Sequence, residues 1–416
     1  MISFWNFQLH YVIFYPVIMS IVWITGALVF YYRWERRPRL PLESHPRFSI
    51  IIAAHNEEST INSVVDNLSR VNYPSFEVVL VNDGSTDNTG RLIDGLSERY
   101  PGWCRAVHLA PNSGKSKAIN TGVLFSKGEL ILVMDADCFL HRNALRMMAW
   151  HFEKFPRTGA VTGNPRIINR TCLLGKIQVG EYSSIIGLIK RSQRILGKVL
   201  TVSGVIAAYR RDAFFDCRFF DSDTATEDID ITWKLQKLRW EVRYEPRALC
   251  YILSPETING LWRQRVRWAR GGIGVVVKHF DVWLDWKNRR FWPVYVDYLA
   301  GMAWALCLGN VVLFLGISHF LHLMGITARP FLLPAWSGPL LAALCMLQFM
   351  VSMYIDYRYE RKTFLKYYFW IIWYPFFYWG ISALSVYGAM YDIFRRRGGT
   401  LSIWKSPDRG LHTLKS

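Results

Sequence analysis

The chain has 416 residues, of which 51% are hydrophobic and 20% charged, and its formal net charge is +18. Its basic clusters stand beside apolar segments, and it has no zinc-finger, helix-turn-helix or RNP pattern. The charge therefore favours Lys and Arg on the cytoplasmic side of membrane spans over a nucleic-acid partner. The seven Cys form no CxxC pair, which argues against a disulfide framework or a zinc site. We expect a soluble part, in a reducing compartment, and a membrane part.

Residues 11–32 are apolar and almost uncharged. A stretch of about 22 residues can cross a ~30 Å hydrocarbon core, at 1.5 Å per residue. A cleavable signal peptide fits less well, because no charged region precedes the stretch and no small-x-small site ends it. Positive charges follow it, at Arg33, Arg36 and Arg37. We predict a transmembrane anchor over residues 1–38, with the N-terminus outside and the next segment in the cytoplasm.

The next part, residues 39–256, is predicted to be a cytoplasmic α/β domain. Three short apolar runs, residues 48–54, 76–81 and 129–134, alternate with helix-like periods and end in polar residues. This alternation predicts βα units and a parallel, Rossmann-like sheet. In such sheets ligands bind beyond the carboxyl ends of the strands, which is where these polar residues stand.

The C-terminal part is predicted to be membrane-embedded over residues 293–392. Three long apolar segments, roughly residues 294–320, 337–354 and 368–391, have the length and composition of transmembrane helices. The preceding stretch, residues 257–292, is predicted to be an amphipathic segment at the membrane surface.

The side of the C-terminus is left open by the sequence. Residues 356–362 are predicted to be a cytoplasmic loop and residues 329–334 an outside linker. Four spans put both termini outside, whereas the positive-inside rule places the cluster at 395–397 in the cytoplasm. A last segment that only dips into the interface, broken near Pro375, removes this conflict. Residues 393–416 form a basic tail.

Aspartates end two of the three apolar runs. In the third run, Asp135 and Asp137 are two residues apart, so in a strand both carboxylates can face one ligand. Oxygen ligands beside a phosphate suit Mg²⁺ or Mn²⁺; the alternative is a solvated or helix-capping turn. Asp83 ends the second run in an Asn-Asp-Gly-Ser turn, which can cap the next helix and still offer Asp83 to a base or ribose. We predict a metal site at Asp135 and Asp137.

A third acidic group stands in Thr226-Glu227-Asp228, where a helical pattern begins. These residues can serve only as a cap, with acids placed against the helix dipole. They can also do chemistry, because a carboxylate there can act as general base on an acceptor hydroxyl.

Gln264, Arg267 and Trp268 are spaced three and four apart in a helical stretch and share one face. Arg267 can pair with a diphosphate and neutralise leaving-group charge, and Trp268 can stack on a sugar ring. An amphipathic helix at the membrane surface is the simpler interpretation, and both can hold. Lys115 lies in a basic glycine turn without P-loop spacing, where phosphate contact and a solvated loop are about equally plausible.

These motifs, in this order, resemble those of the processive, inverting family-two glycosyltransferases, which include the cellulose, chitin, hyaluronan and poly-N-acetylglucosamine synthases. The resemblance implies a GT-A-type α/β domain inserted between transmembrane helices, a nucleoside-binding Asp83, and Asp135 and Asp137 at the diphosphate and metal. The catalytic residues that it implies are Asp228 as base, Glu227 and Arg267. The substrate-binding residues that it implies are Ala54, Asn56, Glu57, Asp83, Lys115, Asp135, Ser203, Gly204, Gln264, Arg267 and Trp268.

Further stretches look like one branch, the bacterial poly-β-1,6-N-acetyl-D-glucosamine synthases. They are residues 162–167, 177–191, 201–208, 244–250 and 404–410. This branch implies UDP-N-acetylglucosamine and the growing glycan as substrates, in the cell inner (cytoplasmic) membrane. It also implies a small accessory membrane subunit and cyclic di-GMP at the interface with it. His55 departs from the usual residue of a Cys/Tyr-Asn-Glu motif, a change that we expect to matter little.

The sequence favours a processive synthase that joins N-acetylglucosamine units and passes the polymer outward through its spans. Another β-glycan synthase, of the hyaluronan, chitin or cellulose type, is one alternative. A second is a non-processive transferase that glycosylates a lipid carrier, which does not need the Gln264-x-x-Arg267-Trp268 pattern. A transporter with a regulatory soluble domain is disfavoured, because the spans carry few charges.

Overall fold

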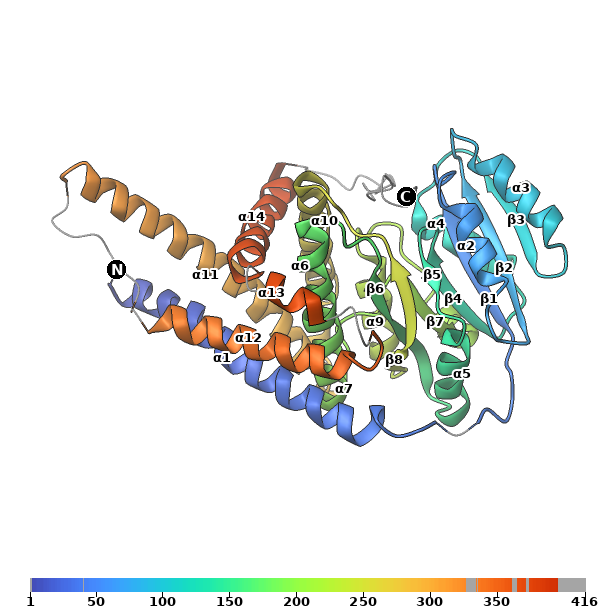
Figure 1. The fold of residues 1–416 in the computed structure, drawn as a ribbon, viewed down its shortest axis with the longest axis horizontal. Helices are drawn as coiled ribbons and strands as arrows, with labels where there is room; N and C mark the ends of the chain where they lie inside the picture. The colour runs from blue at the N-terminus through green and yellow to red at the C-terminus, as the bar shows by residue number, and fades with distance from the viewer. Residues whose placement is uncertain are drawn as a thin grey trace.

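The computed structural model describes residues 2–39, 41–326, 334, 336–360, 365–371 and 374–395. A sheet with its covering helices lies at one end of the molecule, long helices project from the other, and a layer of helices stands between them (Figure 1). The sheet has eight strands in the order β3-β2-β1-β4-β7-β6-β8-β5. This architecture confirms the predicted α/β domain next to membrane helices.

Four neighbouring strands of the sheet are parallel, as predicted. They are β1 (Phe48–Ala54), β2 (Phe76–Asp83), β3 (Cys104–Leu109) and β4 (Leu130–Asp135). The connecting helices are α2 (Ile61–Leu68), α3 (Thr89–Arg99) and α4 (Lys115–Leu124). Every residue of β1 is buried, because Ile50 and Ile52 pack into the core on one face of the sheet and Ile51 into the core on the other. Strand β3 was not predicted, since this half-buried edge strand has no apolar run.

The other half of the sheet is mixed, which corrects the expectation of a parallel sheet. Strand β7 runs antiparallel to both β4 and β6, β8 runs parallel to β6, and β5 is antiparallel to β8. These strands are β5 (Phe139–Leu140), β6 (Thr158–Ile167), β7 (Ile206–Arg210) and β8 (Glu241–Ile252). The helices among them are α5 (Ala144–Lys154), α8 (Arg211–Asp216) and α9 (Glu227–Lys237).

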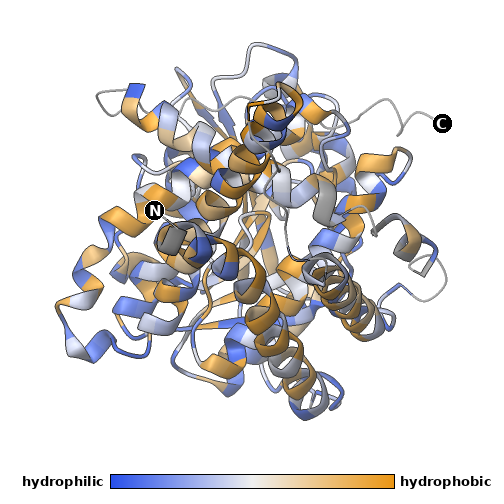
Figure 2. Cartoon of the chain, turned by 90° about the vertical axis from the view of Figure 1, so that its left-hand side faces the viewer, coloured by the Kyte–Doolittle hydropathy of each residue, from blue (hydrophilic) through white to orange (hydrophobic). Residues whose placement is uncertain are grey.

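Within the described part of the chain, three helices are long and apolar enough to cross a membrane, over Phe4–Glu35, Trp292–Leu323 and Ser337–Asp356. They are α1 (Ile2–Phe30) with its π-helical end η1 (Tyr31–Glu35), α11 (Trp292–Leu323) and α12 (Ser337–Asp356). Figure 2 shows hydrophobic residues along these helices, viewed from the end to which they project. Three of the four predicted spans therefore lie in helices of suitable length.

The last predicted span, residues 368–391, differs from the other three. Its described parts are α13 (Tyr368–Ile371), a π-helical turn η6 (Pro375–Trp379) and α14 (Gly380–Arg395). The irregular turn begins at Pro375, the residue at which a break was considered, because proline cannot donate a helical hydrogen bond. The predicted outside linker, apart from Pro334, and the tail beyond Arg395 lie outside the described residues.

A layer of helices separates the sheet from the long apolar helices (Figure 1). It consists of α6 (Leu173–Glu181), its π-helical continuation η2 (Tyr182–Leu188), α7 (Ile189–Leu196) and α10 (Ile258–Lys278). Helix α7 packs along α1, and α10 packs against α14. Two 3-10 turns, η3 (Phe280–Trp283) and η4 (Trp286–Asn288), lead from α10 to α11.

A buried ion-pair network joins this layer to the membrane helices. Arg191 of α7 donates to both carboxylate oxygens of Glu35, at 2.7 and 3.0 Å, and to Asp356 Oδ1 at 2.8 Å. Arg166 of β6 reaches Asp356 Oδ2 at 2.9 Å. All four side chains are at most 2% exposed. Because Glu35 ends the first apolar helix and Asp356 ends α12, the network ties the sheet and α7 to the ends of two predicted spans.

Candidate active site

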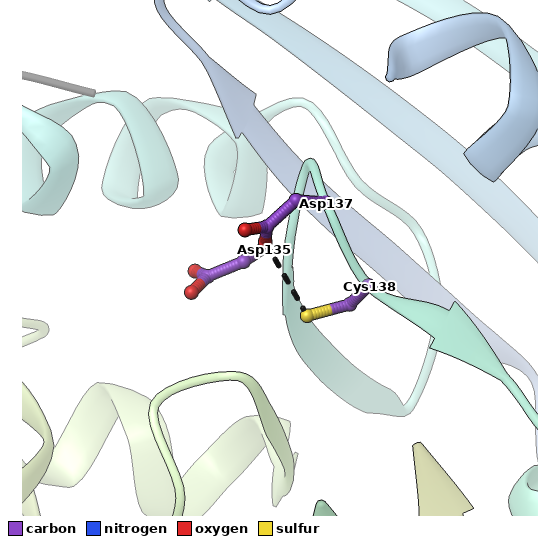
Figure 3. Close-up of side chains that lie close together, drawn as sticks. All are labelled: Asp135, Asp137 and Cys138. Carbon is purple, nitrogen blue, oxygen red and sulfur yellow. Dashed lines mark hydrogen bonds between the residues drawn. The ribbon is translucent and has the colours of Figure 1, made fainter. Parts of the chain in front are cut away.

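Asp135 and Asp137 stand at the carboxyl end of β4 and in the turn that follows it. One ligand atom from each, and the thiol of Cys138, all lie within 4.8 Å of one another. Figure 3 shows the two carboxylates pointing to the same side of the turn. Burial and the charge of Asp135 together raise the pKa of Asp137 to about 7, while the charge of Lys115 opposes the rise.

The donor set at this turn fits a hard divalent cation. Two carboxylates offer the oxygen ligands that Mg²⁺ and Mn²⁺ prefer, whereas a thiol suits softer metals. The Cys138 thiol instead donates to Asp137 Oδ1 at 3.6 Å. Two like charges held close together in a buried turn are the arrangement that a cation stabilises. Asp135 and Asp137 therefore fit the predicted metal role, with Cys138 as a neighbour rather than a ligand.

Lys115, the first residue of α4, joins the two acidic motifs. Its Nζ lies 2.6 Å from Asp135 Oδ1 and 3.4 Å from Glu227 Oε1. Burial lowers the pKa of Lys115, but the carboxylates of Asp135 and Glu227 outweigh this and raise it. The side chain is 23% exposed. Of the two sequence-based interpretations, the solvated loop is therefore wrong, because Lys115 lies within the acidic cluster.

Asp83 is fully buried at the end of β2 and holds the loop that leads to Lys115. The Ser113 N–H and hydroxyl each donate to Asp83 Oδ1 at 2.8 Å, and the Gly114 N–H donates to Oδ2 at 2.8 Å. Gly84 makes this contact possible, since a Cβ there would lie 2.6 Å from the Asn112 nitrogen. The geometry thus gives Asp83 a positioning role, and its contact with a nucleoside stays a prediction.

The loop after β1 docks onto the loop after β2 through Asn56 and Glu57. The Thr86 N–H donates to Asn56 Oδ1 at 2.8 Å, and the Glu57 N–H donates to Thr89 Oγ1 at 2.7 Å. Ala54, the last residue of β1, is buried beneath them. His55, whose identity we expected to matter little, bridges the neighbouring loops: its Nδ1 lies 2.9 Å from the Asp83 carbonyl oxygen, and its Nε2 lies 3.1 Å from Asn112 Nδ2.

Asp228 lies in the first turn of α9, beside Glu227. Burial and the charge of Glu227 together raise the pKa of Asp228 to about 6, while Lys115 and Arg267 oppose the rise. The loop before β7 passes close by, because a Cβ on Gly204 would lie 3.3 Å from Asp228 Oδ2. A carboxyl group with a pKa near neutrality is suited to accept a proton from a bound hydroxyl. Gly204 has no side chain, so it leaves the space next to this carboxyl group open.

Lys190 of α7 is a neighbour of this site that sequence reasoning did not single out. It is 5% exposed, and its Nζ lies 3.4 Å from Thr162 Oγ1, which also accepts the Ser203 N–H at 2.8 Å. Burial lowers the pKa of Lys190 to about 8, and the charge of Asp228 opposes this. A signal existed in the sequence, since Lys190 and Arg191 follow the apolar stretch 185–189.

Helix α10 brings Gln264, Arg267 and Trp268 to the same region. The exposed Arg267 acts electrostatically on both Lys115 and Asp228. Gln264 Oε1 is buried and has no hydrogen-bond partner among the described residues. The Arg265 guanidinium lies 4.4 Å from the ring centroid of Trp268, so this ring already makes a cation–π contact within the protein. Its stacking on a sugar stays a prediction.

Two small contacts hold α10 in place. Arg265 donates to Glu181 Oε2 of α6 at 2.8 Å. Gly271 packs directly against the residue before α9, since a Cβ on Gly271 would lie 2.4 Å from Thr226 Cγ2. A glycine is therefore needed where α10 meets the start of α9, next to Glu227 and Asp228.

The structure gathers half of the predicted residues into one cluster, and places the others around it. Asp135, Asp137, Lys115, Glu227, Asp228, Arg267 and Gly204 are linked by the contacts and electrostatic interactions above. The carboxylate of Asp83 is instead turned into the 112–114 loop, and Asn56 and Glu57 bind the 85–89 loop. These residues shape the sheet edge beside the cluster.

Comparison with known proteins shows which proteins resemble this chain in sequence and fold. A family model described as "Glycosyltransferase like family 2" matches residues 45–271. Poly-β-1,6-N-acetyl-D-glucosamine synthase of Staphylococcus epidermidis is 37% identical over 411 residues, covering 96% of this chain and 98% of the relative. The synthase of the same name from Staphylococcus aureus is 37% identical over 417 residues, covering 98% and 99%.

Among solved structures, a mannosyltransferase from Pyrobaculum calidifontis in complex with GDP-Man and Mn²⁺ resembles the chain with a TM-score of 0.59. The identity is 20%, over 87% of this chain and 98% of that one. This likeness supports the assignment of the fold.

Proposed function

The chain belongs to the family-two-like glycosyltransferases, and on this premise we propose that it polymerises N-acetylglucosamine from UDP-N-acetylglucosamine into a β-1,6-linked glycan at a membrane. One observation carries the proposal: the 37% identity to poly-β-1,6-N-acetyl-D-glucosamine synthases extends over 96% of the chain, so it includes both the sheet and the membrane helices. A relative that shared only the sheet would support the chemistry but not the polymer.

The donor sugar nucleotide binds at the carboxyl edge of β1, β2 and β4 in this proposal. Asp135 and Asp137 hold a divalent cation, Mg²⁺ or Mn²⁺, which supplies positive charge for the diphosphate when bound. Arg267 is exposed, and its charge interacts electrostatically with Lys115 and Asp228. It can therefore pair with the departing diphosphate. Lys115 keeps Asp135 and Glu227 in place from the other side.

Asp228 is the base that removes the proton from the acceptor hydroxyl. The pKa of about 6 leaves the group mostly ionised at neutral pH and still basic enough to accept a proton. Attack on the anomeric carbon from the side opposite UDP inverts an α-linked donor to a β-linkage. The backbone at Gly204 leaves room beside the carboxylate, and Gln264 Oε1 is a buried acceptor for a sugar hydroxyl or amide.

Several finer features of the proposal rest on the family resemblance and on the placement of charge. The sheet faces the cytoplasm of a cell whose cytoplasmic membrane holds α1, α11 and α12, because Arg33, Arg36 and Arg37 follow the first span. The polymer passes outward between the spans. A small accessory membrane subunit, with cyclic di-GMP at the interface, completes the assembly.

The donor and product are tested with the full chain purified into lipid nanodiscs. We expect UDP release from UDP-N-acetylglucosamine in the presence of Mg²⁺ or Mn²⁺, and little from UDP-glucose, alone or with UDP-glucuronate. The product should be a long chain on size analysis. A single sugar attached to lipid would reject the polymerase and favour the lipid-carrier transferase, and a UDP-glucose preference would move the chain to another synthase branch.

A further inference from the structure

A hollow lies away from the candidate active site, where the chain enters α11. It is a cavity of about 950 Å³, lined by the C-terminal end of α7, the start of β8 and the segment 287–293. Eight of its sixteen lining residues are Lys or Arg, and only Glu241 is acidic. None of the sixteen belongs to the acidic cluster or to the predicted substrate-binding residues, so the cavity is a separate feature of the molecule.

The positive charges of this cavity are poorly neutralised by the protein. Arg243 pairs with Glu241, at 2.6 Å between Nη2 and Oε2. Within the described residues, none of the other seven cations of the wall has a carboxylate oxygen within 4.0 Å. The Arg194 Nη1 donates to the carbonyl of Val242 at 2.8 Å, and Arg157 Nη2 to the carbonyl of Arg239 at 2.8 Å. These bonds orient the guanidinium groups without removing their charge.

The cavity is also a place where cations are held at an electrostatic cost. Burial and the charges of Arg194, Arg157 and Arg290 together lower the pKa of Lys198 to about 8, while Glu241 opposes them. Burial and the charge of Arg243 lower the pKa of Arg194 to about 10. A bound anion raises both pKa values again, because its negative charge compensates for the lost solvation of the cations and offsets the repulsion between them. Several guanidinium forks around one hollow match the oxygens of a phosphate in particular.

The surroundings place this cavity at a membrane surface. Phe291 and Pro293 line it, and the apolar helix α11 begins between them. The segment just before exposes large apolar side chains, with Phe280 62%, Leu284 82% and Trp286 67% exposed. Exposed aromatic and apolar side chains beside cations are typical of a segment that lies at the level of lipid headgroups.

We propose that this cavity binds a phosphate-bearing anion at the membrane surface, supplied either by the headgroup of an acidic phospholipid or by a soluble phosphate. The occupant also stabilises the loop that leads to Asp228. Gln236, on the cavity wall, holds Val199 through two hydrogen bonds of 3.0 and 2.7 Å, and the chain continues from there to Gly204, beside Asp228.

Two cavity variants and one control test the proposal with the full chain. Lys198→Gln with Arg194→Gln removes two half-buried charges from the inner wall, and Lys287→Gln with Arg289→Gln removes two from the exposed rim. Arg36→Gln with Arg37→Gln removes two exposed charges beside the first span, outside the cavity. The readout is the shift in melting temperature without any sugar nucleotide, so it does not depend on the proposed transferase activity. One arm uses nanodiscs with and without phosphatidylglycerol, and the other uses detergent with inorganic phosphate at constant ionic strength.

We expect the anion to raise the melting temperature of the wild type and of the control variant, and much less that of either cavity variant. Each Lys or Arg near an anionic surface contributes on the order of fivefold in affinity, so two should account for about 25-fold. A shift only in nanodiscs identifies the lipid headgroup, and a shift in detergent identifies a soluble phosphate. No shift in either arm, or equal shifts in the control and cavity variants, overturns the proposal. The rim variant keeps the test informative if the inner-wall variant fails to fold.

Discussion

The proposed base, Asp228, must be ionised to act, although its surroundings make ionisation of its carboxyl group unfavourable. Its pKa is raised to about 6 by burial and by Glu227, and a general base acts only when deprotonated. We therefore expect kcat for UDP release to be level above pH 6 and to fall about tenfold per pH unit below it. Glu227→Gln removes the neighbouring negative charge, so the pKa of Asp228 should fall and the acidic limb of the profile should move to lower pH. An acidic limb that stays in place in this variant would argue against Asp228 as the titrating group.

The metal role of Asp135 and Asp137 has a pH signature of its own. A metal binds the deprotonated carboxylate, and the pKa of Asp137 is raised to about 7. Affinity for Mn²⁺ should therefore weaken as the pH falls through 7, and Asp137→Asn should weaken it at every pH. Mn²⁺ titrations followed by electron paramagnetic resonance measure both effects. Cys138→Ser is the matched control, and a large loss of Mn²⁺ affinity in that variant would make the thiol a ligand.

At the residue scale, the acidic groups were predictable because each marks a local boundary. Asp83 and Asp135 end apolar strands, and Asp228 opens a helical pattern, so position alone singled them out. The partners of these groups were not predictable. Lys190 and Asp228 are 38 positions apart, and only the packing of α7 brings the lysine into the electrostatic range of the carboxylate. For the same reason, the hydrogen bonds of the Asp83 carboxylate to the neighbouring loop were not predicted, and its contact with a nucleoside stays a prediction.

At the scale of elements, the approach of α10 to α9 depends on one glycine. A Cβ on Gly271 would lie 2.4 Å from Thr226 Cγ2, whereas a Cβ on Gly274, one turn further, meets nothing within 4 Å. We expect Gly271→Ala to push α10 away from Glu227 and Asp228 and to lower kcat by about tenfold or more, as misplaced catalytic groups do. Gly274→Ala in the same helix should leave kcat unchanged. Equal kcat values for the two variants would show that the close contact does not position the site.

The ion-pair network ties the sheet and α7 to the membrane helices, and it is fully buried. Arg191→Met leaves Glu35 and Asp356 without their shared partner, a change that typically costs about 3–5 kcal/mol. We expect a clear loss of thermal stability in this variant. Stability should be partly recovered when Glu35→Gln is added, because the charge of Glu35 is then gone while Asp356 keeps its pair with Arg166. Arg36→Met, at an exposed position, is the control, and similar melting temperatures for Arg36→Met and Arg191→Met would contradict a structural role of the network.

Elements with a regular pattern of apolar residues could be predicted from the sequence. Elements whose direction or shape depends on packing against distant segments could not. The parallel strands β1, β2 and β4 and the long apolar helices were predictable from composition and spacing. The reversal of β7 between β4 and β6 was not, because strand direction is set by long connections through α6 and α7 rather than by local pattern. The irregular turn near Pro375 was weighed only as an alternative, since a proline permits a break without requiring one.

At the scale of the whole molecule, the distribution of apolar and charged residues explains three layers: the sheet, the middle helices and the long apolar helices. The sheet buries its two cores, the helices α1, α11 and α12 leave apolar side chains exposed, and the middle layer carries residues that contact both. The acidic cluster stands at the carboxyl end of β4, within electrostatic range of Arg267 on α10 of the middle layer. In the proposed function, each new glycan unit is delivered from this cluster toward the spans, and this property separates the proposal from a transferase that acts on a soluble acceptor.

The most direct test compares polymer formation by the wild type and by Asp228→Asn in the same nanodiscs, with UDP-N-acetylglucosamine and Mn²⁺. We predict that the wild type forms a polymer degraded by a β-1,6-specific hydrolase. Asp228→Asn should bind the donor as tightly and make the polymer about 10²- to 10⁴-fold more slowly. A wild-type rate in Asp228→Asn, or a wild-type product that resists the hydrolase, would contradict the account.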